Sequence, residues 1–162
     1  MSHLLIHRGL AKKYFTENTI SAFRYCFKKK YGIETDIHCT KDGKIVCFHD
    51  FNLKGQFKIN KLVKNINYKN LLKISKTKKK TIPLLRDLIK LSKNKRFLMI
   101  ELKPIFAKNN LKILINEVNK IKNYSLTSFK EENIINLYKM KKNLNLGLLI
   151  PSTSKFKNIL EK

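Results

Sequence analysis

The sequence predicts an α/β fold built on a largely parallel β-sheet, and three observations support this prediction. Short apolar segments with the character of buried strands recur along the chain. Segments with apolar residues at helical spacing separate most of them, as in βα units. The chain has 162 residues, which is the length of one domain with a sizeable core. We therefore expect a single domain over residues 1–162.

The first predicted elements are a strand, a helix and a long extended segment. HLLI at 3–6 is a short apolar run close to a glycine, which predicts a buried strand. Apolar residues recur at helical spacing over 20–31, and Gly32 is expected to end this helix.

An antiparallel hairpin is predicted over residues 33–50, as an exception to the parallel sheet. Its two extended halves, ETDIHCTK and KIVCFHD, are joined by Asp42-Gly43, a strong hairpin signal. A parallel crossover would need about a dozen connecting residues, which are missing here.

The expected register of this hairpin pairs Lys41 with Lys44 around a two-residue turn. Asp36 would then lie directly opposite His49, with Cβ atoms about 5 Å apart. Glu34 would share their face, because strand side chains alternate. Three polar groups would thus meet at one end of the hairpin.

The second half of the sequence continues the alternation of helices and strands. A proline opens the next predicted helix, and the last helix is expected to run to the chain end. The segments in order are a helix at 83–92, a strand at 96–103, a helix around 111–118, a strand at 124–129, a helix at 131–142, a strand at 146–150 and the terminal helix.

The composition is strongly basic, with 36 Lys and Arg against 11 Asp and Glu and a formal net charge of +25. Only four of the basic residues are Arg, whereas specific nucleic-acid sites depend on Arg for bidentate base contacts. The lysines are spread along the chain with abundant Asn and Ile, which indicates a general compositional bias. We therefore expect no specific nucleic-acid partner.

The sequence also bears on membranes and compartment. No apolar run approaches the roughly 18 residues of a membrane-spanning helix, so no membrane span is expected. The start, MSHLLIHRG, turns polar too soon for a signal peptide, which predicts a cytoplasmic protein. Cys26, Cys39 and Cys47 are an odd number without a CxxC pair, which indicates reduced, partly buried thiols.

Polar side chains follow several predicted strands, where a βα barrel would have its active-site face. His7 and Arg8 follow the first strand, and Glu101 and Lys103 end a later one. Leu102, between the last two, is expected to point into the surrounding helices. With the hairpin residues, three carboxylates, two histidines, one Arg and one Lys would gather at one edge.

This set of side chains has a chemical meaning. Three clustered carboxylates repel one another unless a cation lies among them, and all-oxygen ligands suit Mg²⁺ or Ca²⁺. Arg8 and Lys103 suit an anionic group such as phosphate, although they would alternatively pair with Glu17 and Glu101. Two histidines can act as general base and general acid near neutral pH. The set points to metal-assisted hydrolysis of a phosphate ester.

The same residues belong to an ordered series of short motifs that resembles the glycerophosphodiester phosphodiesterase family. The similarity is close from residue 3 to about 103 and continues weakly into YSLTSF. The motifs are, in order, HRG (7–9), ENT (17–19), ExDxxxTKDG (34–43), HD (49–50), IP-L (82–85) and IELK (100–103).

The resemblance implies a TIM-like (β/α) barrel that hydrolyses a small glycerophosphodiester to glycerol 3-phosphate and an alcohol. It implies a role for each matched residue. His7 and His49 would be the acid–base pair, Arg8 and Lys103 would hold the phosphate, and Glu34, Asp36 and Glu101 would ligate a divalent cation, Mg²⁺ or Ca²⁺. Glu17 and Asn18 would cap the first helix and support the site, and Asp50 would be a local hydrogen-bonding support.

His38 shares the face of Glu34 and Asp36 but matches no motif of the family. We expect it to be a polar residue satisfied by a local hydrogen bond. The proline that usually precedes ENT in the family is missing, and Thr16 is expected to cap the helix in its place.

The chain is short for the family that it resembles. A TIM barrel takes typically about 250 residues, so roughly the last two βα units are missing and the barrel is truncated after about six strands. Open sheet edges favour association or instability. Three explanations stay open: a shortened and inactive gene product, a minimal enzyme that closes its barrel as a homodimer, or a partial sequence. Two other functions stay open: an inactive barrel fragment that binds nucleic acid or anionic lipid through its basic residues, and a phosphodiesterase that acts on lysophospholipids.

Overall fold

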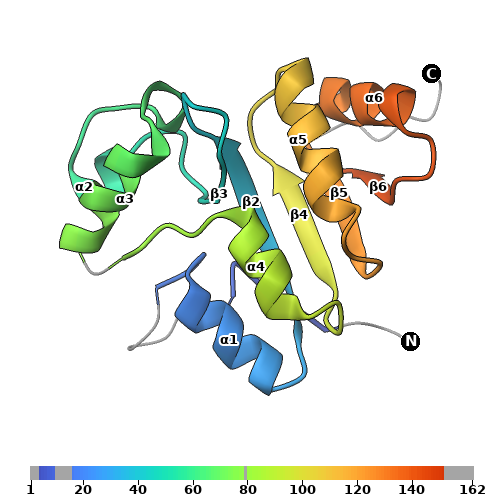
Figure 1. Cartoon of the computed structure of the whole chain (residues 1–162), viewed down its shortest axis with the longest axis horizontal. Coiled ribbons are helices and arrows are strands. Elements are labelled where there is room, and N and C mark those ends of the chain that lie inside the picture. The colour runs from blue at the N-terminus through green and yellow to red at the C-terminus, as the bar shows by residue number, and fades with distance from the viewer. Residues whose placement is uncertain (1–3, 10–15, 79, 152–162) are drawn as a thin grey trace.

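The computed structural model describes residues 4–9, 16–78 and 80–151, and it has the predicted α/β fold with a largely parallel sheet (Figure 1). Within these residues six strands form one sheet in the order β1-β2-β4-β5-β6, all parallel, with β3 antiparallel to β2. The strands are β1 (Leu5–His7), β2 (Gly32–Cys39), β3 (Ile45–Cys47), β4 (Leu98–Leu102), β5 (Tyr124–Ser128) and β6 (Leu146–Leu148). The helices are α1 (Ile20–Lys28), α2 (Lys54–Phe57), the 3₁₀ helix η1 (Val63–Asn65), α3 (Tyr68–Thr77), α4 (Leu85–Ser92), α5 (Lys108–Val118) and α6 (Glu131–Met140).

The two faces of the sheet differ sharply in polarity. Helices α1, α4, α5 and α6 pack on one face, where side chains such as Ile33, Ile100 and Leu126 are fully buried. The side chains that alternate with them, among them Asp36 and Glu101, point to the other face. Leu102 lies in the helix-covered core, as predicted. The sheet thus has one apolar face that is covered by helices and one polar face.

The outermost strands of the described sheet, β1 and β6, each pair with one neighbour. The chain therefore has the parallel sheet of a βα barrel without closure in the part that the structure describes. A homodimer that closes these edges stays a prediction. No described helix is long and apolar enough to cross a membrane.

A small helical unit between β3 and α4 stands beside the sheet (Figure 1). It contains α2, η1 and α3 and has an apolar cluster of its own, which includes Val46, Leu53, Phe57 and Leu71. The unit connects to the sheet where β3 pairs with the end of β2, next to the polar face.

The predicted register of the hairpin is wrong by one residue. Ile37 pairs with Cys47 and Cys39 with Ile45, and the N–H of Phe48 donates to the carbonyl oxygen of Asp36 at 2.9 Å. Asp36 therefore lies opposite Phe48 and not opposite His49.

A three-residue loop causes this shift. The Thr40 N–H donates to the Lys44 carbonyl oxygen at 2.9 Å, so residues 41–43 form the turn. Gly43 has a φ of +71°, the left-handed conformation that such a loop needs at its last position. The Thr40 hydroxyl donates to Asp42 Oδ1 at 2.7 Å, and this side-chain hydrogen bond stabilises the loop.

The end of α1 also differs from the prediction. The helix ends at Lys28, and Gly32 is the first residue of β2, paired with Leu5. A Cβ at Gly32 would lie 2.5 Å from Leu5 Cδ2 and 2.8 Å from the Phe97 carbonyl oxygen. Gly32 is therefore needed because the Leu5 side chain and the Phe97 backbone pass close to it, not because a helix ends there.

Gly32→Ala should destabilise the fold by about 1–3 kcal/mol, the usual cost of inserting an atom into a well-packed core. The Phe97 carbonyl oxygen belongs to the backbone and cannot rotate away from the added methyl. Urea unfolding would measure the loss. Gly55→Ala is the matched control, because the Cβ there meets only the Asp50 carboxylate tip, which can move. Equal stability of the two variants would contradict the prediction.

Other predicted elements agree with the structure except at their ends. Helix α4 begins at Leu85, two residues after Pro83, because the Pro83 carbonyl oxygen accepts a hydrogen bond from Cys47 in β3. The terminal helix lies outside the described residues. All three cysteines are buried, and burial raises the pKa of the Cys39 and Cys47 thiols to about 12.

Candidate active site

Three carboxylates meet on the polar face of two neighbouring parallel strands. Glu34 and Asp36 come from β2, and Glu101 comes from β4, where it is the register partner of Asp36. One oxygen of each lies within 4.8 Å of one oxygen of the others. The cluster exists because strand side chains alternate and because the parallel register places Asp36 beside Glu101.

Asp36 is the most deeply buried member of the cluster and has three polar partners. It is 1% exposed, and its oxygens lie 3.1 Å from Arg8 Nε and 3.5 Å from Lys103 Nζ as ion pairs. The amide of Asn18 donates to it at 3.2 Å. The two cations compensate the negative charge of the cluster on one side.

The alternative pairings expected from the sequence are present as well. Arg8 Nη1 lies 3.3 Å from Glu17 Oε1, and Lys103 Nζ lies 2.8 Å from Glu101 Oε1. Each cation therefore bridges Asp36 and one further carboxylate. The pairs hold Arg8 and Lys103 at the carboxylate cluster, where an anionic group bound there would contact both.

The turn after β1 has an unusual backbone. Arg8 has a φ of +54°, and Gly9 follows with +68°. This conformation costs a residue with a side chain of order 1 kcal/mol or more, and such strain is frequent at functional sites. Here it lets the Arg8 N–H donate to Glu34 Oε2 at 3.1 Å while its side chain reaches Asp36.

Glu34 has an oxygen without a partner. Its Oε1 is buried and accepts no hydrogen bond among the described residues. Burial raises the pKa of Glu34 to about 7, and the charges of Asp36 and Glu101 add to this. A divalent cation would supply the missing partner and relieve the repulsion, so the three carboxylates fit Mg²⁺ or Ca²⁺.

The two histidines expected to be catalytic lie at the edge of this cluster. His7 ends β1 as the register partner of Glu34, and its Nε2 lies 3.8 Å from Glu34 Oε2. Its side chain is 72% exposed. His49 follows β3, and its Nδ1 lies 2.8 Å from Asp50 Oδ1, the contact expected of a supporting carboxylate. His49 and Lys103 line one hollow of about 670 Å³.

His38 is satisfied by a local hydrogen bond, as predicted. Its Nε2 lies 3.1 Å from the carbonyl oxygen of His49, which can only accept, so Nε2 carries a proton. Burial lowers the pKa of His38 to about 4, so the ring is neutral at pH 7. The ring also packs edge-on against Phe51, with centroids 5.2 Å apart.

Glu17 and Asn18 support the site but do not cap the helix. The cap of α1 is Thr19, with an extended φ of −118° and a side chain that accepts from the Ala22 N–H. The predicted cap at Thr16 is also wrong, because the helix begins only at Ile20. Glu17 and Asn18 are thereby free to contact Arg8 and Asp36.

Two threonines near the cluster were missed from the sequence. Thr35 is fully buried and donates to Asn18 Oδ1 at 2.7 Å, which orients the amide toward Asp36. Thr127 in β5 is the register partner of Glu101, and its hydroxyl is buried without a partner among the described residues. Aligning the parallel strands by their polar ends would have placed Thr127 beside Glu101.

Comparison with known proteins identifies the family. A model described as the glycerophosphoryl diester phosphodiesterase family matches residues 7–154. A glycerophosphodiester phosphodiesterase from Bacillus altitudinis is 32% identical over 110 residues, which are 63% of this chain and 44% of that protein. One from Caldanaerobacter subterraneus is 30% identical over 161 residues, 90% of this chain and 65% of that protein. The chain thus spans less than two thirds of the length of these relatives.

Solved structures agree with this relationship. The glycerophosphodiester phosphodiesterase of Thermotoga maritima superimposes with a TM-score of 0.80 at 25% identity and covers 99% of this chain and 69% of that chain. A phosphodiesterase of Oleispira antarctica, solved with the product sn-glycerol-3-phosphate, superimposes with a TM-score of 0.82 at 19% identity and covers 99% and 71%. The family model spans most of this sequence and the fold agrees, and the chain therefore belongs to the glycerophosphoryl diester phosphodiesterase family.

Proposed function

We propose that the protein hydrolyses glycerophosphodiesters to glycerol 3-phosphate and an alcohol with the help of a divalent cation. The observation that carries this proposal is the cluster of Glu34, Asp36 and Glu101 with one unpartnered carboxylate oxygen. Arg8 and Lys103 stand at the same cluster and suit the phosphate group of such a substrate.

The residues of the candidate site have distinct roles in the proposed reaction. Glu34, Asp36 and Glu101 hold the cation, which supplies positive charge to the phosphate oxygens when bound. Arg8 and Lys103, which contact the same cluster, would bind the phosphate oxygens. One of His7 and His49 removes a proton from the attacking water or substrate hydroxyl, and the other protonates the alcohol oxygen as its bond to phosphorus breaks.

The relatives support the substrate class. The Bacillus and Caldanaerobacter proteins are both named glycerophosphodiester phosphodiesterases. The Oleispira structure holds sn-glycerol-3-phosphate, the product expected here. Thr127 has a free hydroxyl beside Glu101 and is a further candidate to contact substrate.

Release of glycerol 3-phosphate from glycerophosphocholine, with and without chelator, tests the proposal. Turnover should disappear with chelator and return with Mg²⁺ or Ca²⁺. His49→Ala should lower kcat by about 10²–10⁴-fold, the usual contribution of a general acid or base. Asp50→Asn is the matched variant, because it keeps the ring and an acceptor at Nδ1 and removes only the charge of the carboxylate. It should reduce kcat less than His49→Ala does.

Other outcomes separate this function from its alternatives. Chelator-resistant turnover, or full activity of His49→Ala, would contradict the assigned roles. A folded protein that binds the cation but releases glycerol 3-phosphate from no diester would favour an inactive binding module. Release from lysophosphatidylcholine alone would favour a lysophospholipid phosphodiesterase.

A further inference from the structure

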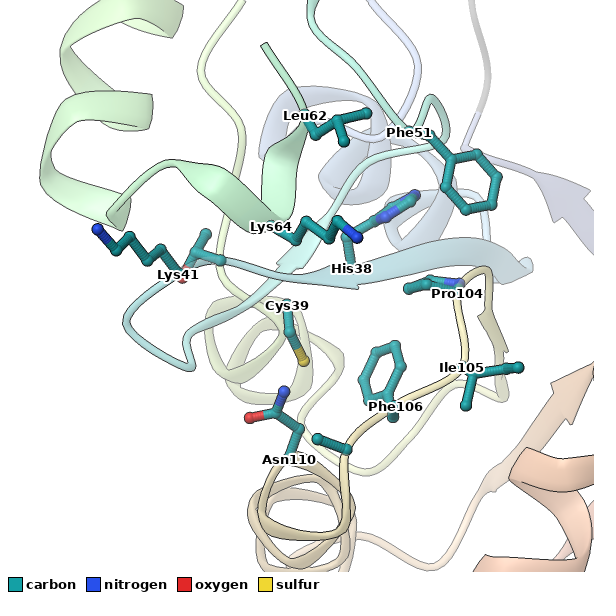
Figure 2. A pocket seen from close by; sticks show the side chains of 12 residues that line it. His38, Cys39, Lys41, Phe51, Leu62, Lys64, Pro104, Ile105, Phe106 and Asn110 are labelled. Atoms are coloured by element: carbon teal, nitrogen blue, oxygen red, sulfur yellow. The ribbon is translucent and has the colours of Figure 1, made fainter.

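A second hollow lies next to the candidate site and takes no part in the proposed chemistry. It has a volume of about 440 Å³ and lies between the ends of β2 and β4 and the segment after β3 (Figure 2). His38, which lines it, follows Asp36 by two residues on the same strand, and Pro104 directly follows Lys103. The hollow therefore opens beside the carboxylate cluster.

Three large apolar side chains at this hollow are exposed. Phe51 is 50% exposed, Leu62 37% and Ile105 53%. They come from segments far apart in the sequence, yet all three line the same hollow. Phe51 and Leu62 lie on one side of His38 and Ile105 on another (Figure 2). We call these three residues the apolar rim.

Exposed lysines line the same two hollows as the apolar rim. Lys41 and Lys64 line the same hollow, and Lys54 and Lys58 line the adjoining one, which Phe51 shares. We call these four residues the lysine ring. Among the described residues, the only carboxylate that lines either hollow is Asp50, which is paired with His49.

The segment that contributes Phe51, Leu62 and most of these lysines is also strongly basic in sequence. Residues 51–86 contain ten Lys and one Arg but neither Asp nor Glu. A patch of exposed apolar side chains with a cationic border is typical of proteins that lie on an anionic lipid surface. Lysine alone gives such attraction without base-specific contacts.

We infer that the apolar rim and the lysine ring dock the protein on an anionic lipid bilayer, with the candidate site facing the lipid. The apolar rim enters the interface, and the lysine ring contacts the anionic headgroups. Nucleic acid fits less well, since the rim is mainly aliphatic and offers one aromatic ring for base stacking. The inference extends the proposed function, on which it rests, by locating the protein and its candidate site at a membrane surface.

Co-sedimentation of the whole chain with lipid vesicles tests this inference without any need for turnover. Mixed phosphatidylcholine–phosphatidylglycerol vesicles should bind the protein, with affinity that falls as salt rises, and pure phosphatidylcholine vesicles should bind it far less. Leu62→Ser/Ile105→Ser should weaken binding to the mixed vesicles about tenfold, because apolar area no longer leaves water.

Ile135→Ser/Tyr138→Ser is the matched control. These two side chains of α6 are 41% and 53% exposed and line neither hollow. The control pair should bind vesicles like the parent, and both pairs should hydrolyse soluble glycerophosphocholine like the parent.

Three results would overturn the inference: equal vesicle binding by the two pairs of variants, undiminished binding to neutral vesicles at high salt, or binding to single-stranded RNA but not to vesicles. If the protein binds vesicles through the apolar rim but shows no turnover, the proposed function is contradicted and the inference about docking is not.

Discussion

Glu101→Gln is expected to lower turnover about a thousandfold, because a cation that neutralises the phosphate contributes several kcal/mol and each 1.36 kcal/mol is about tenfold in rate. Glutamine has nearly the shape of glutamate but gives up the charge that holds the cation. Glu101 is 8% exposed, and its Oε1 lies 2.8 Å from Lys103 Nζ. The substitution also leaves Lys103 with one carboxylate partner in place of two.

Calorimetric titration with Mg²⁺ and with Ca²⁺ would accompany the assay of glycerol 3-phosphate. We expect Glu101→Gln to lose measurable affinity for the cation in parallel with turnover. Glu132→Gln is the matched control, because Glu132 is exposed in the first turn of α6. Unchanged cation affinity in Glu101→Gln would remove this residue from the ligand set, even if activity fell.

Alternation along strands made the core of the site predictable. Glu34 and Asp36, and likewise Glu101 and Lys103, are spaced by two residues, which places each pair on one face of a strand. Parallel strands can then bring the two pairs together on one face, and the observed register pairs Asp36 with Glu101.

Contacts that depend on special backbone geometry could not be predicted in the same way. The one-residue error in the hairpin came from the loop at 41–43, because Asp-Gly suits both two- and three-residue turns. Gly32 was assigned to a helix end, although the close approach of Leu5 and Phe97 requires it. The apolar rim could not be predicted from the sequence, because Leu62 and Ile105 lie in segments whose apolar residues show no helical or strand periodicity.

The final prediction concerns stability rather than turnover. Asp36→Ala should destabilise the metal-free protein by about 3 kcal/mol, since removing one partner of a buried ion pair leaves its counter-charges uncompensated. Arg8 and Lys103 lie within 3.5 Å of Asp36 and are only 19% and 16% exposed. Loss of these attractions outweighs the relief of repulsion with Glu34.

A double-mutant cycle in urea separates this ion-pair effect from a simple packing loss. If Lys103 depends on Asp36, Asp36→Ala should cost less in the Lys103→Met background than in the parent, because one of the orphaned cations is already gone. Asp87→Ala, at an exposed position in the first turn of α4, should cost below about 1 kcal/mol, the scale of a helix-dipole interaction. Additive effects of Asp36→Ala and Lys103→Met would contradict coupling between them. A metal-free Asp36→Ala protein more stable than the parent would show instead that carboxylate repulsion dominates the empty cluster, and that its cohesion depends on the cation.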